Sequence, residues 1–284
     1  MKVALVHDWL NQYGGAEVVL EAMHSLYPDA PVYTSLYDAA AMPPHFRSWD
    51  IRPSFIQRLP LASRVFRALL PLYPLAFEQF DLRQYDLVLS SSSSWAKGVI
   101  TTPDTVHVCY CHAPMRYTWD VFYEEAPRHN LLLRIPLAPV ISYLRLWDVQ
   151  GANRVDSFVA NSHFVAAKIR KYYRRESVVV YPPVDTAFFQ PGNSDGDYYL
   201  VISRLRPYKR VDLAVEAFNQ LGLPLKIVGV GEQAARLRRM AGRRIEFLGF
   251  TGREQLRDLM AGCRALVVPG KEDFGLAPVE VMAT

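Results

Sequence analysis

Short apolar runs alternate along this chain with amphipathic stretches of helical period. The apolar runs predict a first series of strands near residues 2–7, 31–37, 86–90, 106–111, 157–161 and 177–181, and a second near 198–202, 225–229, 245–249 and 264–268. The clearest helix is predicted over residues 16–26, where Val18, Val19, Ala22, Met23 and Leu26 share one face. This alternation is typical of parallel sheets covered by helices on both faces, so the chain is predicted to be an α/β protein.

Residues 191–197 interrupt this pattern with Pro, Gly, Asn, Ser and Asp, a composition typical of a linker. A new strand and helix series begins at residue 198. The sequence therefore predicts a domain over residues 1–190, a linker over 191–197 and a second domain over 198–284. A chain of 284 residues is long enough for about two domains.

Composition and charge narrow the class of protein. Half of the residues are hydrophobic and 21% are charged, as in ordinary globular enzymes. A net charge of +4 is too small to indicate a nucleic-acid partner. Residues 198–284 nevertheless hold fourteen Lys or Arg against nine Asp or Glu, so the second domain is basic and would suit a diphosphate ligand.

The three cysteines form neither a disulfide framework nor a metal-binding set. Cys109 and Cys111 alternate along a predicted strand, which suggests small buried residues in a reducing compartment. The chain begins with a strand-like run instead of a signal peptide. Its longest apolar region, residues 131–147, contains Arg and Pro and is shorter than the roughly 20 residues of a membrane span. A cytoplasmic location is expected.

The last thirteen residues place two acids eight positions apart across a turn that opens a helix. The turn Phe274-Gly275-Leu276 follows a strand that appears buried in the sequence pattern, and its glycine lets backbone amides approach a phosphate. Glu272 lies before the turn and Glu280 on the helix, where carboxylates can accept hydrogen bonds from adjacent sugar hydroxyls. The segment is suited to binding a sugar nucleotide.

Three further motifs accompany this segment, namely Gly14-Gly15-Ala16-Glu17, Tyr110-Cys111-His112-Ala113-Pro114 and Ser203-Arg204-Leu205-Arg206-Pro207-Tyr208-Lys209-Arg210. Together with the E-x7-E spacing, they resemble the retaining glycosyltransferases of family 4 over nearly the whole chain. The resemblance implies the GT-B fold, in which two Rossmann-like βαβ domains face each other across a crevice. Ser203 and Arg210 stand where the family pattern usually has glycines, which affects the expected loop geometry more than the charge.

The chemistry of sugar transfer assigns roles to several of these residues. A departing diphosphate needs preorganised positive charge, which Arg204 and Lys209 would supply without a metal cofactor. The resemblance gives His112 a contact with the donor sugar, although His112 could instead be a core histidine bonded to backbone. Glu272 is expected to position the reacting sugar through its carboxylate. Gly14 and Gly15 would let the chain pass close to the donor phosphate or the acceptor.

Two motifs invite other interpretations. Gly229-Val230-Gly231-Glu232-Gln233-Ala234 fits a dinucleotide motif, but it follows the second strand of its domain, so we favour a loop beside a sugar nucleotide over an NAD site. Asp195-Gly196-Asp197 fits a metal-binding pair, but its setting favours a turn, and no metal ligand is predicted. The serines Ser90 to Ser94 are expected to form a turn whose members Ser91, Ser92 and Ser93 touch acceptor hydroxyls.

Donor and acceptor are suggested by resemblance alone. Residues 110–120 look like the central region of bacterial mannosyltransferases of O-antigen or exopolysaccharide assembly, which implies GDP-mannose, with UDP-sugars second, and a saccharide or lipid-linked acceptor. Residues 45–77 mix arginines with large apolar side chains. That mixture suits either a peripheral surface at the inner face of the membrane or an amphipathic segment packed on a sheet, and the sequence leaves both open.

Two other functions stay open at this stage: a non-catalytic nucleotide-sugar-binding protein on the same fold, and an NAD-dependent oxidoreductase or epimerase. The second domain is also expected to be incomplete, because the chain stops within the helix that carries Glu280, without a capping glycine or a following strand. A chain truncated there is expected to be poorly soluble and to transfer no sugar.

Overall fold

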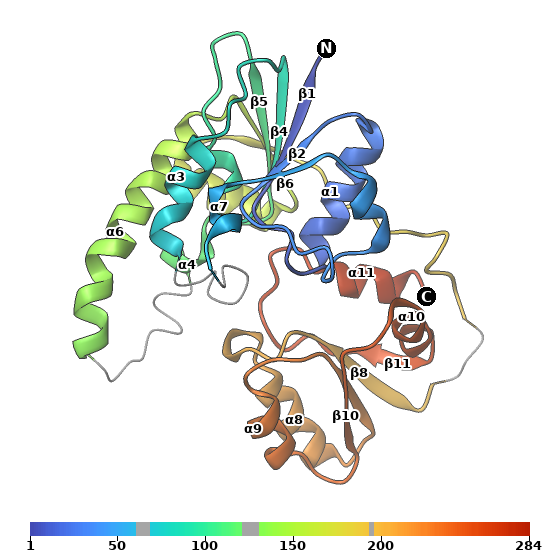
Figure 1. Ribbon diagram of the computed structural model, residues 1–284. Helices are drawn as coiled ribbons and strands as arrows, with labels where there is room; N and C mark the ends of the chain where they lie inside the picture. The colour runs from blue at the N-terminus through green and yellow to red at the C-terminus, as the bar shows by residue number, and fades with distance from the viewer. Residues whose placement is uncertain (61–68, 121–130, 193–195) are drawn as a thin grey trace. The chain divides into compact units, whose positions relative to one another are not determined.

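The computed structural model describes residues 1–60, 69–120, 131–192 and 196–284 (Figure 1). The chain divides into two compact units, Met1–Pro183 and Val184–Thr284. Each unit contains one parallel β-sheet with helices packed against it. The predicted α/β fold with two Rossmann-like domains is confirmed.

The sheet of the first unit has seven parallel strands in the order β3-β2-β1-β4-β5-β6-β7. In chain order they are β1 Val3–His7, β2 Val32–Thr34, β3 Ile51–Pro53, β4 Leu87–Ser92, β5 Val106–Cys111, β6 Ser157–Ala160 and β7 Ser177–Val179. The chain runs outward from β1 in one direction and then resumes at β4 on its other side. This reversal creates a topological switch point between β1 and β4, and ligands of open α/β sheets bind outside the carboxyl ends of the strands at such a point.

Helices cover both faces of this sheet (Figure 1). The α-helices are α1 Gly15–Leu26, α3 Tyr73–Glu78, α4 Arg116–Trp119, α6 Leu131–Asn153 and α7 His163–Tyr173, and short 3₁₀ turns span Pro44–Ser48, Phe55–Arg58, Leu70–Leu72 and Ala96–Gly98. The predicted helix over residues 16–26 is confirmed as α1. Ser162 caps α7, because its hydroxyl accepts a hydrogen bond from the Val165 N–H at 3.1 Å.

The second unit has a four-stranded parallel sheet in the order β10-β9-β8-β11. Its strands are β8 Tyr198–Ile202, β9 Leu225–Val228, β10 Ile245–Gly249 and β11 Cys263–Leu266, and its helices are α8 Val211–Leu221, α9 Ala234–Met240, α10 Arg253–Ala261 and α11 Leu276–Met282. A 3₁₀ turn spans Pro207–Lys209. This sheet also reverses direction, so a second switch point lies between β8 and β11.

Several sequence expectations need correction. The strand β3 was not predicted, because Ile51–Pro53 has only three residues and ends in proline. Ser90, Ser91 and Ser92 belong to β4 instead of a turn, since small hydroxyl side chains fit between the flanking strands β1 and β5. The strand over residues 264–268 looked buried from its apolar content, but Arg264 and Ala265 are exposed. They are exposed because β11 is the last strand at its side of the sheet.

The boundary between the units lies earlier than the expected linker. Residues 184–190, placed in the first domain from the sequence, belong to the second unit. Phe189 is buried in an apolar cluster with Tyr198 and Met260, and the carboxylate of Asp185 accepts a hydrogen bond from Arg253 at 2.7 Å. These contacts attach the segment to β8 and α10.

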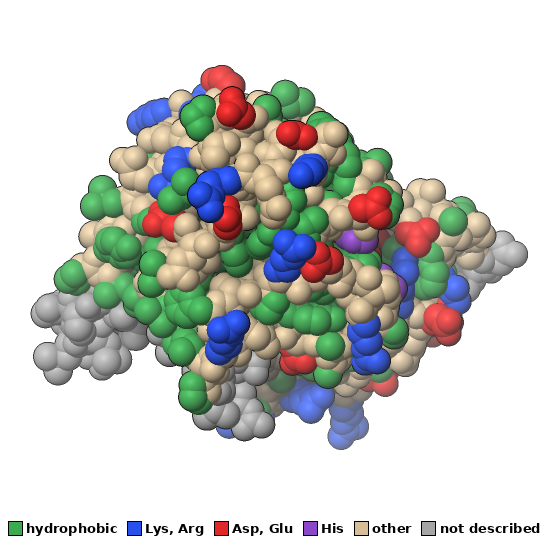
Figure 2. Space-filling model, turned by 45° about the horizontal axis from the view of Figure 1, so that its top comes forward, with side chains coloured by type: hydrophobic (Ala, Val, Ile, Leu, Met, Phe, Trp, Pro, Cys, Tyr) green, Lys and Arg blue, Asp and Glu red, His purple; other side chains and the backbone are tan. Residues whose placement is uncertain are grey.

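Two features bear on the expected membrane association, namely the distribution of charge on the surface and the packing of residues 45–77. Lys and Arg side chains are interspersed with Asp and Glu on the face shown in Figure 2. Tyr73 and Phe77 are fully buried in the core of the first unit, as expected for an amphipathic segment packed on a sheet. Arg64, Phe66 and Arg67 lie outside the described residues. Within the described ranges, no helix combines the length and apolar character needed to cross a membrane.

Arg210 provides a direct test of backbone strain. It adopts a left-handed conformation (φ 51°, ψ 34°) directly before α8, at a position where the resembled family usually has glycine. This conformation costs a non-glycine residue roughly 1–2 kcal/mol. Ser203, at the other departure from the pattern, has no positive φ.

We therefore expect Arg210→Gly to be about 1 kcal/mol more stable than Arg210→Ala in chemical denaturation, because both lose the same side chain but only Gly relieves the strain. Glu216 is the matched control, since it is exposed within α8. There the order should reverse, with Ala more stable than Gly by about 1 kcal/mol. Equal stability of the two Arg210 variants would contradict a strained position.

Candidate functional site

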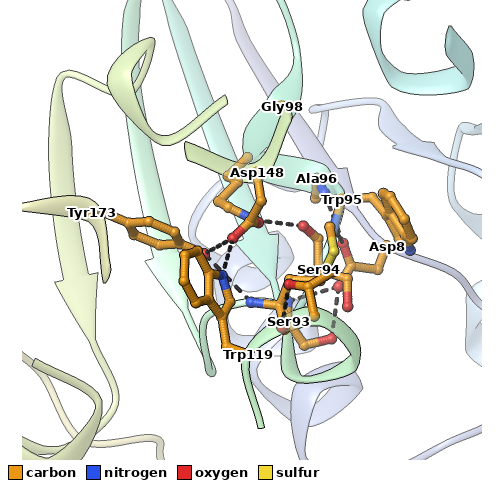
Figure 3. A network of polar contacts seen from close by, with 12 residues as sticks. Asp8, Ser93, Ser94, Trp95, Ala96, Gly98, Trp119, Asp148 and Tyr173 are labelled. Atoms are coloured by element: carbon orange, nitrogen blue, oxygen red, sulfur yellow. Dashed lines mark hydrogen bonds and ion pairs between the residues drawn. The ribbon is translucent and has the colours of Figure 1, made fainter. Parts of the chain in front are cut away.

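The carboxylate of Asp8 organises the carboxyl edge of the first sheet. Asp8 directly follows β1 and is only 2% exposed. Its Oδ2 accepts hydrogen bonds from the backbone N–H and the hydroxyl of Ser93, and its Oδ1 accepts from the N–H groups of Trp95 and Ala96, each at 2.7 Å (Figure 3). Four donors satisfy the buried charge. They fix the loop after β4 against the end of β1.

A buried ion pair holds the same loop from the opposite side. Lys97 is 1% exposed and its Nζ lies 2.5 Å from Oδ1 of Asp148 on α6, which is 0% exposed. Lys97 also donates to the carbonyl of Ser94, while the Tyr173 hydroxyl and the Trp119 indole N–H donate to Oδ2 of Asp148 at 2.9 and 2.8 Å (Figure 3). Each buried charge therefore has a partner of opposite sign and further hydrogen bonds.

His112 lies at the end of β5, and a chain of polar contacts connects it to α1. Its Nε2 is 2.8 Å from the hydroxyl of Ser91, which is 3.1 Å from Nδ1 of His7. The Nε2 of His7 lies 3.4 Å from Oε1 of Glu17. Burial, together with the neighbouring imidazole of His7, lowers the pKa of His112 to about 3, so His112 is neutral at neutral pH.

The predicted acceptor serines occupy different environments. The Ser91 hydroxyl lies between two histidines, and the Ser93 hydroxyl donates to Asp8. The Ser92 hydroxyl is buried without a hydrogen-bond partner in the described part of the chain. Their contact with acceptor hydroxyls stays a prediction.

Gly14 and Gly15 open α1 at the same edge of the sheet, with Gly14 as the N-cap residue. A Cβ on Gly14 would lie 3.4 Å from Oε2 of Glu17. Glu17 was named from the sequence only as part of the Gly14-Gly15-Ala16-Glu17 motif, and His7 and Asp8 were not identified. Glu17 is in fact 4% exposed and faces His7. Two polar residues at the end of an otherwise apolar strand were the signal that could have found His7 and Asp8.

In the second unit, two predicted residues meet at the switch point. Lys209 follows β8, Glu272 follows β11, and Nζ of Lys209 lies 2.5 and 2.7 Å from the two carboxylate oxygens of Glu272. Both side chains are largely covered, at 14% and 29% exposure. Arg204, on the same loop as Lys209, is exposed. The carboxyl edge of this sheet therefore presents cations from one loop and an acid from the next.

The glycines Gly229 and Gly231 allow close packing against this cationic loop. A Cβ on Gly229 would lie 1.9 Å from the Ser203 carbonyl oxygen, and one on Gly231 would lie 2.4 Å from that of Leu205. The backbone N–H of Leu205 donates to the Val230 carbonyl at 3.0 Å between them. The two glycines are thus explained by the close approach of two backbone segments within the second unit. A bound NAD pyrophosphate is not needed to account for them.

Gly275, in the turn between Phe274 and Leu276, has a left-handed conformation (φ 86°) and is the N-cap of α11. Glu280 lies on α11 and is partly buried. Burial raises the pKa of Glu280, and the positive charge of Arg253 opposes this shift.

No group of three His, Cys, Asp or Glu side chains suited to a metal ion occurs among the described residues. Of the acidic pair before β8, Asp195 falls outside those residues and Asp197 is exposed. All three cysteines are free thiols, and Cys109 and Cys111 are buried in the same apolar cluster, as their alternation predicted.

Two Rossmann-like units, each with polar groups at its switch point, define a GT-B type of protein. The family model described as Glycosyltransferase Family 4 matches residues 13–188, and that described as Glycosyl transferases group 1 matches residues 184–284. The first match covers well over half of the chain, so the chain belongs to glycosyltransferase family 4.

An uncharacterized glycosyltransferase of Methanocaldococcus jannaschii is 25% identical over 135 residues, a match that covers 45% of this chain and 38% of that protein. Among solved structures, HepE of Anabaena in complex with UDP matches with a TM-score of 0.67 and 20% identity over 100% of this chain and 78% of that chain. Sucrose-phosphate synthase of Thermosynechococcus elongatus matches with a TM-score of 0.71 and 17% identity over 99% and 79%. Both structures share the fold.

The buried ion pair of Lys97 and Asp148 yields a stability prediction. Lys97→Met should lower the free energy of unfolding by about 3–5 kcal/mol, because it leaves the Asp148 carboxylate buried without its counter-charge. The double variant Lys97→Met/Asp148→Leu should be more stable than Lys97→Met, since it buries no unpaired charge. A double-mutant cycle by chemical denaturation measures the coupling. Strictly additive losses would show that the two charges do not interact.

Proposed function

We propose that the protein is a retaining glycosyltransferase that moves a hexose from a nucleotide-diphosphate sugar to a saccharide or lipid-linked saccharide. The observation that carries the proposal is the pairing of Lys209 with Glu272 at the switch point of the second unit, in a chain of glycosyltransferase family 4. Two loops that are distant in the sequence present charge at the edge where α/β sheets bind ligands.

The charges in the second unit suit a departing diphosphate. An ammonium group has three N–H donors, and the two contacts of Lys209 with Glu272 leave one donor for a phosphate oxygen. Glu272 would hold the ammonium in place, while Arg204 offers a planar fork that can bind two phosphate oxygens. Preorganised charge of this kind acts where negative charge develops in the transition state. We propose that it does so without a metal ion.

The remaining predicted residues would contribute further donor contacts, each described within its own unit. Glu280 and the turn around Gly275 would bind hydroxyls and phosphate, and neutral His112 would contact the sugar. The front-face route implied for retaining enzymes of this family uses an oxygen of the departing phosphate to take the acceptor proton. It therefore requires no protein carboxylate as a base.

For the donor we propose GDP-mannose, on the resemblance of residues 110–120 to bacterial mannosyltransferases. HepE, whose structures contain UDP and UDP-glucose, supports the wider class of nucleotide-diphosphate sugars. A lipid-linked acceptor would require the protein to act at the inner face of a membrane, so the acceptors tested should include lipid-linked saccharides.

The function is tested by incubating the full-length protein with radiolabelled GDP-mannose, UDP-glucose or NADH, with saccharide and lipid-linked acceptors, in EDTA. We expect sugar transfer, or slow donor hydrolysis without acceptor, from GDP-mannose, and no loss of rate in EDTA. Transfer from UDP-glucose alone would correct the donor, and recovery of lost activity by Mg²⁺ or Mn²⁺ would overturn metal independence. Binding without turnover would indicate a binding protein, and hydride transfer an oxidoreductase.

The proposed phosphate contacts predict a specific kinetic signature. Lys209→Ala and Arg204→Ala should each lower kcat by about a hundredfold to a thousandfold with little change in donor Kd, because their charge matters most as the phosphate departs. Arg243→Ala is the matched control, since Arg243 is exposed next to the opposite, amino end of β10. That variant should keep the parent kcat. Unchanged kcat with only a raised KM in the Lys209 variant would contradict the role.

Substitutions of Glu272 and Glu280 should have different effects on kcat and KM in the same assay. Glu272→Gln keeps oxygen and nitrogen atoms next to Lys209 but removes the carboxylate charge, so kcat should fall. Glu280→Ala should mainly raise the donor KM, because it removes contacts made equally in the ground state and the transition state. The reverse assignment of the two effects would show that these roles are exchanged.

A further inference from the structure

The polar contacts around His112 restrict where its ring carries a proton. Its Nε2 contacts the Ser91 hydroxyl, whereas its Nδ1 makes no hydrogen bond to the residues that the structure describes. A neutral imidazole has one N–H, so one nitrogen donates and the other accepts. The bond that Nε2 makes to Ser91 therefore decides whether Nδ1 of His112 is a donor or an acceptor.

Ser91 couples this choice to a second histidine. Its hydroxyl lies 3.1 Å from Nδ1 of His7 and 2.8 Å from Nε2 of His112. The hydroxyl has one hydrogen, so it can donate to only one of the two rings and must accept from the other. A change at His7 thus reverses the direction of the hydrogen bond at His112.

Glu17 fixes the other side of the His7 ring. Glu17 lies in the first turn of the twelve-residue helix α1, where the helix dipole favours a carboxylate, and both side chains of the pair are buried. A carboxylate only accepts hydrogen bonds, so Nε2 of His7 carries a hydrogen in either charge state of that ring. The charge state of His7 is therefore decided at Nδ1, which faces Ser91.

Two complete arrangements of hydrogen bonds follow. When His7 is neutral, Ser91 donates to His7 and accepts from Nε2 of His112, which leaves Nδ1 of His112 as an acceptor. When His7 is protonated, it donates to Ser91, Ser91 donates to Nε2 of His112, and Nδ1 of His112 carries the hydrogen. The second state differs from the first by one proton added at Nδ1 of His7, one rotated hydroxyl, and the transfer of the His112 hydrogen from Nε2 to Nδ1 by exchange with water.

We propose that Glu17, His7 and Ser91 are positioning residues that set the tautomer of His112, so that protonation of His7 converts Nδ1 of His112 from an acceptor into a donor. Among the described residues, the ionisable groups near His7 are Glu17 on α1, the adjacent Asp8 carboxylate at the end of β1, and His112, which directly follows β5. The Asp8 carboxylate is already bonded by four donors, whereas Oε1 of Glu17 faces Nε2 of His7.

The consequence for recognition rests on the proposed function. If His112 contacts the donor sugar, the acceptor form binds a sugar hydroxyl through its hydrogen, and the donor form binds the same group through its oxygen lone pair. The pH would then select which hydrogen bond His112 makes with the sugar. The tautomer itself can be measured without any donor, so a failure of this inference is distinguishable from a failure of the proposed function.

The test uses protein labelled with ¹⁵N in its histidines and two-bond ¹H–¹⁵N spectra, recorded over about pH 5 to 8, where histidines ordinarily change charge. As the pH falls and His7 takes up a proton, His112 should change from the Nε2–H to the Nδ1–H tautomer with the same midpoint. In Glu17→Gln both changes should move together to a different pH, because the carboxylate that contacts His7 is replaced by a neutral amide.

Ser91→Ala should uncouple the rings, so that His112 keeps one tautomer while His7 still titrates, and Ser91→Thr, which restores a hydroxyl, should restore the coupling. Ser90→Ala is the matched control, because Ser90 lies on the same strand but contacts Nε2 of His107 at 2.8 Å. It should leave the change at His112 intact.

Three results would overturn the proposal. They are a His7 that keeps one charge state over the whole pH range, a His112 that keeps one tautomer while His7 titrates in the parent protein, and an unchanged response in Ser91→Ala. The first two need no variant, so the proposal stays falsifiable even if a substitution prevents folding.

Discussion

The structure of the first unit depends on the hydrogen bonds that compensate one buried carboxylate. Asp8 stands at the end of the strand from which the sheet grows in both directions, and its charge has no room to reach water. Three backbone N–H groups and one hydroxyl from a single loop compensate that charge. The loop after β4 can therefore take few other shapes. It continues directly from β4, whose register with β1 places Ser91 opposite His7.

The two units place different chemistry at equivalent points of their sheets. In the first, the switch point gathers histidines and a hydroxyl whose hydrogen bonds can reverse direction. In the second, it gathers Lys209 and Glu272, whose charges are opposite and fixed. Groups that can exchange donor and acceptor roles suit a sugar, whereas fixed charge suits a phosphate.

Much of this arrangement was predictable because central strands of parallel sheets are continuous apolar runs. The central strands over residues 106–111 and 198–202 matched their apolar runs, as did the edge strand over residues 245–249, and the pattern found α1. Two other edge strands were harder to predict, since β3 is short and β11 is exposed on one side. The prediction of a turn at the serines of β4 was wrong, because propensity alone places serine in turns. Burial between β1 and β5 determines their strand conformation here. Motif spacing identified Lys209 and Glu272. His7 and Asp8 belong to no motif, and their roles become visible only from their contacts with residues of β4 and the loop after it.

The pairing of Lys97 with Asp148 also affects how the chain is synthesised. Lys97 precedes β5 in the sequence, whereas Asp148 follows β5 on α6. During translation, α6 therefore leaves the ribosome well after the loop that carries Lys97. Until α6 arrives, the ammonium group lacks the counter-charge of Asp148 that compensates for its removal from water. Strands β1, β4 and β5 can pair earlier, but the loop that carries Lys97 stays open. The edge of the sheet that holds the two histidines is thus completed late during translation, when the nascent chain already contains most of its first unit.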